Sequence, residues 1–223
     1  MNRFCILALL AAGLIQGAII GQIDTFEDGT TQGWTAGGGP VGGVPPNPPA
    51  NIPTGGPAGL NDNYLQITSN GSSGAGGRLV ALNALGQWAG DYAGLGLGVI
   101  SMDLINLGQS DLEIRLYLEN PIPGPPTDDA VTGSFFLPAG SGWMHATFDV
   151  SAAGLTVLNG SAANLLSNVT VLRIMHNAAA GFPPPQIAAV LGVDNIAAEV
   201  PEPSTMLLSM FGAGMLLLNR HRR

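Results

Sequence analysis

The sequence contains almost no cysteine: the only one among 223 residues is Cys5, which lies inside an apolar N-terminal run. We expect that run to be removed as a signal peptide, so no thiol would remain in the mature protein. This excludes a disulfide framework, a zinc–thiolate site and a cysteine nucleophile. With 46% apolar residues, the chain can instead bury an ordinary hydrophobic core within one domain.

Positive charge is also scarce. The chain has no lysine, its seven cations are arginines, and charged residues make up 10% of it, where about 25% is usual. Between residues 22 and 199, fourteen acidic side chains face only Arg78, Arg115 and Arg173, a net charge of −11. This balance excludes nucleic acid as a partner. It favours solubility and neutral glycans, because anionic polymers would be repelled unless divalent cations bridged them.

Helical periodicity is nearly absent between residues 22 and 199, where apolar and polar residues alternate instead. The clearest stretch is 112–119, in which leucine and isoleucine alternate with charged residues and tyrosine, as in a half-buried antiparallel strand. Residues 99–107 are predicted as a second strand, and the turn residues 108–111 indicate that the two form a hairpin. Only residues 161–167 are expected to be helical.

Seven more strands are predicted, at residues 23–27, 64–69, 78–82, 134–137, 144–150, 169–176 and 191–198. Many short strands separated by glycine and proline predict an all-β fold, an antiparallel β-sandwich with jelly-roll-like connections over residues 22–199. The segment 37–59 is rich in both glycine and proline, so we expect it to be a mobile surface loop.

The first 21 residues contain one cation, Arg3, followed by an uncharged run over residues 4–15. This composition is typical of a signal-peptide helix, and the run is too short for an ordinary transmembrane span. Residues 1–21 are therefore expected to direct export through the secretory translocon, with candidate cleavage positions at Gly17, Ala18 and Gly21. A buried N-terminal helix is the alternative.

The C-terminal segment 200–223 combines Pro201, Glu202 and Pro203 with an uncharged, mostly apolar stretch of thirteen residues at 206–218 and a basic end at 220–223. As a helix, that short transmembrane segment spans about 20 Å, whereas the hydrocarbon core of a bilayer is about 30 Å thick. It would hold the membrane only transiently, in an orientation fixed by the arginines. An ordinary tail anchor is the alternative.

In combination, these C-terminal features resemble the PEP-CTERM sorting signal of Gram-negative bacteria. The resemblance implies recognition by an exosortase, a membrane-embedded enzyme, followed by removal of the hydrophobic helix. Other sorting signals whose short hydrophobic tail is cut away work by the same logic. We therefore expect the protein to cross the inner membrane and reach the cell surface or the extracellular matrix.

Short motifs in the middle of the chain have a recognisable order. Phe26-Glu27-Asp28-Gly29 precedes Gly33-Trp34, Gly142-Trp143 opens a predicted strand, and Val193-Asp194-Asn195-Ile196 lies near the end. They resemble the jelly-roll domains of exported carbohydrate-binding modules. The resemblance implies that the first and last strands are neighbours and that Glu27 and Asp194 hold a structural calcium ion. Carboxylates and nearby carbonyls are the ligands that calcium prefers, but solvated turn carboxylates are the alternative.

Aromatic side chains with polar neighbours are candidates for stacking on sugar rings. Trp88 and Tyr92 lie in a predicted loop, and Tyr117 is expected to face outward beside Arg115 and Glu119. We therefore predict that Trp88, Tyr92 and Tyr117 bind the ligand. Trp34 and Trp143 are expected to pack at the edges of strands instead.

No catalytic pattern is present in the sequence. His145 and His176 have no partner at metal-ligand spacing, and no Gly-x-Ser-x-Gly turn occurs. The adjacent carboxylates Asp128 and Asp129 lie beside a proline-rich stretch, where they are expected to stay solvated in a loop rather than hydrolyse a glycosidic bond.

The sequence thus predicts an exported, exosortase-sorted, non-enzymatic β-sandwich that binds exopolysaccharide weakly. Its alternatives are a purely structural matrix protein without a specific ligand and a secreted glycan-active enzyme.

Overall fold

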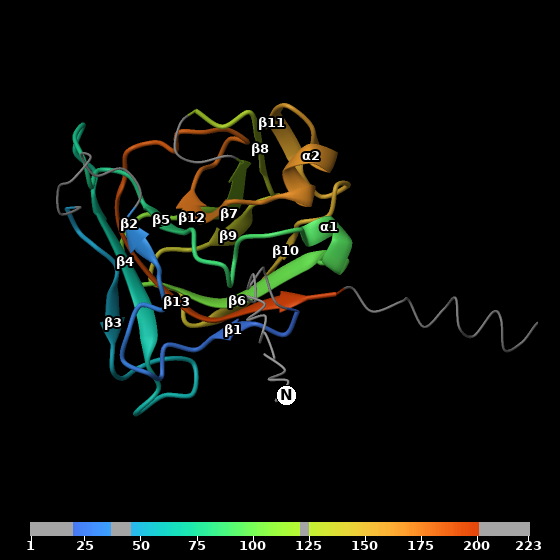
Figure 1. Cartoon of the computed structure of the whole chain (residues 1–223). Helices are drawn as coiled ribbons and strands as arrows, with labels where there is room; N and C mark the ends of the chain where they lie inside the picture. Colours follow the sequence, from blue (N-terminus) through green and yellow to red (C-terminus); the bar gives the residue numbers. More distant parts are fainter. Residues whose placement is uncertain (1–19, 37–45, 121–124, 201–223) are drawn as a thin grey trace, which may run out of the picture.

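A computed structural model of the chain describes residues 20–36, 46–120 and 125–200, which form two antiparallel sheets (Figure 1). The all-β sandwich predicted from the alternation is therefore confirmed. The expected signal helix and the hydrophobic C-terminal helix lie outside the described residues. None of the helices within the described residues is long and apolar enough to cross a membrane.

One sheet has six strands, and its central strand is the last of the domain, β13 (Ala188–Glu199). Along the sheet the order is β10 (Met144–Asp149), β6 (Val99–Asn106), β13, β4 (Tyr64–Asn70) and β3 (Ala50–Ile52). The short β1 (Ile23–Asp24) also pairs with β13, through Ile23 and Ala197. The first and last strands are thus neighbours, as the resemblance to carbohydrate-binding modules implies.

The second sheet has seven strands. Its order is β11 (Thr156–Asn159), β8 (Asp128–Val131), β7 (Leu112–Asn120), β12 (Val171–His176), β5 (Val80–Asn83) and β2 (Thr35–Ala36), with β9 (Phe135–Leu137) also pairing with β7. Two short helices, α1 (Tyr92–Leu95) and α2 (Ala162–Ser167), lie at one end of the sandwich (Figure 1). The helix expected at residues 161–167 is confirmed.

The hydrophobic core lies between the two sheets. On β7 the inward side chains Leu112, Ile114, Leu116 and Leu118 are fully buried, and on β6 Ile100, Met102 and Leu104 face them across the core. Burying each such side chain stabilises the fold by about 1.5–3 kcal/mol. The alternation along the sequence thus identified which face of these strands is buried.

The hairpin predicted for residues 99–107 and 112–119 is wrong. Both strands form, but β6 pairs with β10 and β13, while β7 pairs with β8, β9 and β12 in the other sheet. The turn residues 108–111 therefore cross from one sheet to the other instead of reversing the chain within one sheet. Turn-forming composition is compatible with either connection, because it specifies a change of direction and not a partner strand.

Part of the segment 37–59 belongs to the six-stranded sheet, although its composition predicts a mobile loop. Residues 50–52 form β3, whose Asn51 aligns with Leu65 of β4, so this part belongs to the sheet. The Asn51 amide also donates to the backbone oxygens of Phe26 and Thr30, at 2.7 and 2.8 Å. These contacts fix residues that were expected to be mobile. Residues 37–45 lie outside the described residues.

Candidate functional site

Trp88 and Tyr92, which were predicted to bind sugar from a loop, are both completely buried. The Trp88 indole donates to Asp24 Oδ2 at 2.7 Å, and the Tyr92 hydroxyl donates to the Trp88 backbone oxygen at 2.7 Å. Burial raises the pKa of Tyr92. Neither ring has a face available for stacking, so the prediction of a ligand contact at these two residues is wrong.

The reason is a buried carboxylate that the sequence analysis missed. Asp24 on β1 is 1% exposed and accepts hydrogen bonds from the indoles of Trp34 and Trp88 and from the amides of Gln22 and Gln87. A buried charge is tolerated when several donors surround it. Trp34 and Trp88 are therefore structural, which confirms the packing role expected for Trp34.

Trp143, also expected to pack, is half-buried on the outer face of the six-stranded sheet, where its ring packs nearly perpendicular to that of Tyr64, with the ring centroids 5.4 Å apart. Both rings lie over Gly192 of β13, because a Cβ on this residue would come within 3.2 Å of each ring and 2.5 Å of Ile105. Glycine is therefore required here by close packing.

Tyr117 projects from the outer face of the seven-stranded sheet, the side predicted for it. It belongs to a small cluster with Val131 and Met175 that is separate from the main core. Yet Tyr117 is 1% exposed, because the ring of Phe182 stacks on it with centroids 4.4 Å apart and planes 14° from parallel. Tyr117 is thus not a direct sugar contact, and Phe182, which is 42% exposed, presents an aromatic ring to solvent in its place.

Phe182 lies in residues 177–187, which join β12 to β13 and which we call the strap. Arg115 on β7 holds the start of the strap, since its Nε donates to Asn177 O at 2.8 Å and its Nη2 to Ala178 O at 3.1 Å. Below Phe182, the Tyr117 hydroxyl donates to Asp129 at 2.7 Å, and Asn159 donates to the same carboxylate at 2.7 Å. We call the outer face of the seven-stranded sheet, together with residues 177–187, the strap face.

An ion pair between Arg173 on β12 and Glu119 on β7 lies under the strap face. The side chains are 14% and 4% exposed, respectively. The Arg173 guanidinium carbon is also 5.5 Å from the centre of the Phe182 ring. Its Nε–H is buried and has no acceptor among the residues that the structure describes. A charged, planar group thus lies directly beside the exposed aromatic ring.

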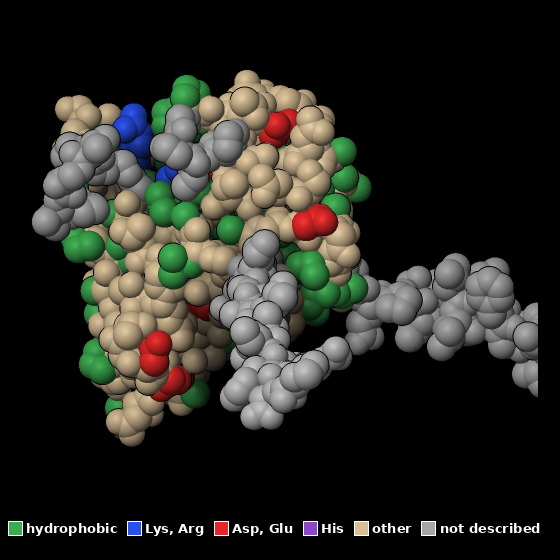
Figure 2. Space-filling view, in the orientation of Figure 1, with side chains coloured by type: hydrophobic (Ala, Val, Ile, Leu, Met, Phe, Trp, Pro, Cys, Tyr) green, Lys and Arg blue, Asp and Glu red, His purple; other side chains and the backbone are tan. Residues whose placement is uncertain are grey.

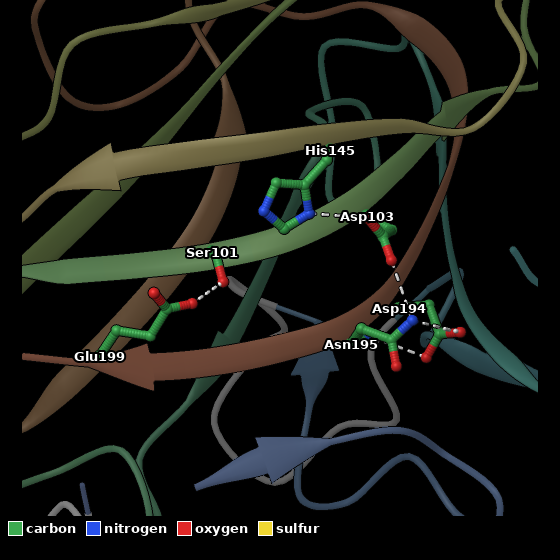
Figure 3. Close-up of polar contacts among 6 residues, drawn as sticks. All are labelled: Ser101, Asp103, His145, Asp194, Asn195 and Glu199. Carbon is green, nitrogen blue, oxygen red and sulfur yellow. Dashed lines mark hydrogen bonds and ion pairs between the residues drawn. The ribbon is translucent and has the colours of Figure 1, made fainter. Parts of the chain in front are cut away.

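Carboxylates gather on the outer face of the other sheet, around Asp194 of β13. Val193 next to it is in the core, so Asp194 projects outward, in register with Asp103 of β6 (Figure 3). Asp194 is 1% exposed, and burial raises its pKa to about 7. The charges of Asp62, Asp103 and Glu27 contribute to this rise, while a hydrogen bond from the Asn195 backbone N–H at 2.7 Å opposes it. We call these four carboxylates the acidic face.

Figure 3 also shows the polar contacts of Asp103 and the nearby pair of Ser101 and Glu199. The Asn195 amide and the His145 ring bind the two oxygens of Asp103, each at 2.9 Å, and Ser101 donates to Glu199 at 2.5 Å. His145 is 60% exposed, as expected of a surface histidine. Within the described ranges, no group of three or more histidine, cysteine, aspartate or glutamate side chains is arranged to hold a metal ion. Calcium between Glu27 and Asp194 would therefore draw on backbone or amide oxygens as well, and it stays a prediction.

Asp128 and Asp129 do not lie in a loop, because both belong to β8 and both are buried. As adjacent strand residues they project to opposite sides of the sheet. The Ser161 N–H donates to Asp128 at 2.9 Å and lowers the pKa of that carboxylate. Asp129 is bound by Tyr117 and Asn159. The expectation that the two acids stay solvated is wrong, since each serves as an acceptor inside the fold.

Comparisons with known proteins agree with both resemblances. The PEP-CTERM protein-sorting motif matches residues 199–223, and proteins with this motif are exported and sorted to the cell surface. The chain therefore carries a PEP-CTERM sorting motif, which includes Pro201, Glu202 and Pro203. No curated protein is similar to the chain in sequence.

The folded domain is similar to solved structures of a carbohydrate-binding module and of an agarase. The family 11 carbohydrate-binding module from Clostridium thermocellum, in complex with a β-1,3-1,4-mixed-linked tetrasaccharide, has a TM-score of 0.51 and 19% identity, over 82% of this chain and 97% of the module. An exo-β-agarase has a TM-score of 0.55 and 12% identity, over 83% of this chain but 26% of the enzyme. At such identities the likeness establishes the β-sandwich fold alone.

Proposed function

We propose that this protein is a non-enzymatic surface or matrix protein whose sandwich domain binds exopolysaccharide weakly at the strap face. The observation that supports it is the exposed ring of Phe182, stacked on Tyr117 and flanked by the guanidinium of Arg173. An aromatic face packs against the C–H groups of a sugar ring, and planar charged side chains bind its hydroxyls. A single exposed ring accounts for weak rather than tight binding.

The sorting motif supports the route by which the domain reaches its ligand. In this proposal the secretory translocon exports the chain, the bacterial membrane holds the tail transiently, and an exosortase removes it. The motif starts at Glu199, where β13 ends, so the domain is complete before the tail begins. Pulse labelling with an epitope after Arg223 tests this step, and an epitope that persists on the surface protein would contradict it.

The binding proposal is tested with full-length protein in a detergent that carries no sugar, on an array of bacterial polysaccharides. Phe182→Ala is expected to reduce binding at least five-fold, because loss of one stacked ring costs about 1 kcal/mol or more. Leu60→Ala is the matched control, since Leu60 is 88% exposed on the loop between β3 and β4 of the other sheet. No binding to any polysaccharide would favour a purely structural matrix protein.

The absence of catalysis is part of the proposal and has its own support. Glycoside hydrolysis needs two carboxyl groups facing one bond, whereas Asp128 and Asp129 project to opposite sides of β8. The protein is expected to release no sugar from a polysaccharide that it binds. Turnover that disappears in Asp129→Asn but not in Asp111→Asn, an exposed control, would show an enzyme instead.

We also propose a structural calcium ion at Glu27 and Asp194. The crowding of carboxylates around buried Asp194 supports it, because a divalent cation would relieve their repulsion. Calcium added to chelated protein is expected to raise the melting temperature, as any ligand of the native state does. The rise should disappear in Asp194→Asn and persist in Asp28→Asn. An unchanged melting temperature in the unmodified protein would refute the site.

A further inference from the structure

We propose that the polysaccharide bound at the strap face is anionic, with carboxylate groups such as those of uronic acids. This inference rests on the proposed function and specifies the class of ligand. It reverses the expectation, drawn from net charge, that neutral glycans are the preferred partners.

All the arginines between residues 22 and 199 converge on the strap. Arg78 Nε donates to Pro184 O at 2.7 Å, and Arg115 donates to Asn177 O and Ala178 O. Arg173 lies beside the ring of Phe182. In Figure 2 the arginine atoms, in blue, gather at the upper left, and most of the visible carboxylates, in red, lie away from them. Every cation of the domain is therefore placed at the same eleven-residue segment, 177–187.

Two of these arginines keep their charge available. Glu119 compensates Arg173, but within the described part of the chain Arg78 and Arg115 form no ion pair and donate only to backbone oxygens. A carbonyl accepts a hydrogen bond without cancelling the charge of its donor. Two other carboxylates lie on this face: Glu113 is two residues before Arg115 on β7, and Asp129 is bound by the Tyr117 hydroxyl. Arg78, two residues before β5, lies opposite Gln186 of the strap in an isolated β-bridge.

The net charge of −11 between residues 22 and 199 does not prevent an anionic polysaccharide from binding at the strap face. At physiological ionic strength the Debye length is about 8 Å, so charges on the far side of the domain are largely screened. The acidic face lies on the outer side of the opposite sheet. A bound anion responds mainly to the nearest groups, and arginine suits carboxylates because its planar N–H groups bind both oxygens.

The decisive test compares one polymer in two charge states. Polygalacturonate is anionic, and its fully methyl-esterified form has the same backbone without the charge. We expect full-length protein, in a sugar-free detergent with a calcium chelator present, to bind polygalacturonate at least ten-fold more tightly than the ester. The preference should weaken as sodium chloride is raised from 50 to 500 mM, because salt screens the contact.

Three variants distinguish the loss of a charge contact from the loss of aromatic stacking. Arg78→Gln is expected to reduce affinity for polygalacturonate roughly ten-fold, the order expected when one charge-assisted hydrogen bond is lost, while Arg78→Lys keeps most of it. Binding of the ester should fall much less than binding of polygalacturonate in both. Phe182→Ala should weaken binding of both polymers. Unchanged melting temperatures in Arg78→Gln and Arg78→Lys will show that the strap remains folded.

Each contrary result has a distinct meaning. Equal binding of both polymers, with loss in Phe182→Ala, would overturn the anionic class and leave the proposed function intact. Binding of polygalacturonate only when calcium is added would also overturn it, because a cation bridge to carboxylates would then replace the arginines. Binding of polygalacturonate or of its ester that is unaffected in Phe182→Ala would overturn the proposed function itself.

Discussion

The two outer sheet faces hold buried charge in opposite ways. On the strap face, buried Glu119 is compensated by Arg173, and buried Asp129 is bound by the Tyr117 hydroxyl and the Asn159 amide. On the acidic face, buried Asp194 lies among carboxylates of the same sign, and its pKa rises to about 7. On one face the buried carboxylates thus have an ion-pair partner or hydrogen-bond donors, whereas on the other burial and like charges raise the pKa of a carboxyl group.

Because of this difference, we expect the stability of the protein to respond differently to changes on each face. On the strap face the buried carboxylates Glu119 and Asp129 already have donors, so removing a donor costs stability directly. A face whose carboxylates repel one another responds to both pH and divalent cations. We therefore expect substitutions on the strap face to change stability at every pH, and those on the acidic face to change how stability depends on pH.

The largest effect is expected from Arg173→Met, which leaves the carboxylate of Glu119 buried and unpaired. Removing one partner of a buried ion pair typically costs about 3–5 kcal/mol. Urea denaturation measures the loss in free energy of unfolding. The double variant Arg173→Met with Glu119→Leu is the control and should recover most of it, because no charge then remains. A loss below about 1 kcal/mol in the single variant would show that the pair is hydrated.

On the acidic face, Asp194 should make the protein more stable as the pH falls. Its pKa is about 7 in the folded state against an ordinary value of 3.8, so the folded protein binds the extra proton between these two values. The free energy of unfolding should then fall as the pH rises from 4 to 7, by at most about 1.4 kcal/mol per pH unit. Above pH 7 this contribution levels off.

Denaturation at several pH values measures this slope, with Asp194→Asn as the comparison, because an amide cannot titrate. Subtracting the slope of the variant from that of the unmodified protein gives the contribution of Asp194 to the pH dependence, because the other carboxylates are present in both proteins. If calcium binds at Glu27 and Asp194, the difference should shrink in its presence, since the cation stabilises the ionised form. Identical slopes in chelator would refute the raised pKa.

A smaller loss is expected on the strap face from Tyr117→Phe, which keeps the ring stacked against Phe182 and removes only the hydroxyl. Asp129 would retain the Asn159 amide as a donor, so the cost should be about 1 kcal/mol at all pH values between 5 and 8. Urea denaturation checks this. Tyr92→Phe, which removes a hydroxyl bound to a neutral carbonyl, should cost no more. A pH-dependent loss would contradict the contrast between the two faces.

The two faces also differ in how far the sequence predicts them. Alternation identifies the outward side of β7, and so it places Tyr117 beside Arg115 and Glu119. It does not reveal Phe182, 65 positions later, which covers that tyrosine. Such cover comes from a connection between strands, and a period of two residues describes only the strands themselves.

The same limit explains the other wrong predictions. Trp88 and Tyr92 have the glycine and aspartate neighbours of an exposed loop, but the buried Trp88 indole is bound by Asp24, more than sixty positions earlier, and the Tyr92 hydroxyl by the Trp88 backbone oxygen. Similarly, β6 and β7 were each recognisable, whereas their assignment to different sheets depends on β13 and β12, which come much later in the chain. Local patterns predict elements well and predict their partners poorly.

The smallest effect is expected from His145→Ala on the acidic face. The sequence predicts a surface histidine, and the ring is 60% exposed, with its only described polar contact at Asp103. An exposed pair of this kind contributes between about 0 and 0.5 kcal/mol, so urea denaturation at pH 8 should barely distinguish the variant. A loss above about 1.5 kcal/mol would mean that the His145 ring orders Asp103 and Asn195, and that hydrogen bonds hold the acidic face as firmly as the strap face.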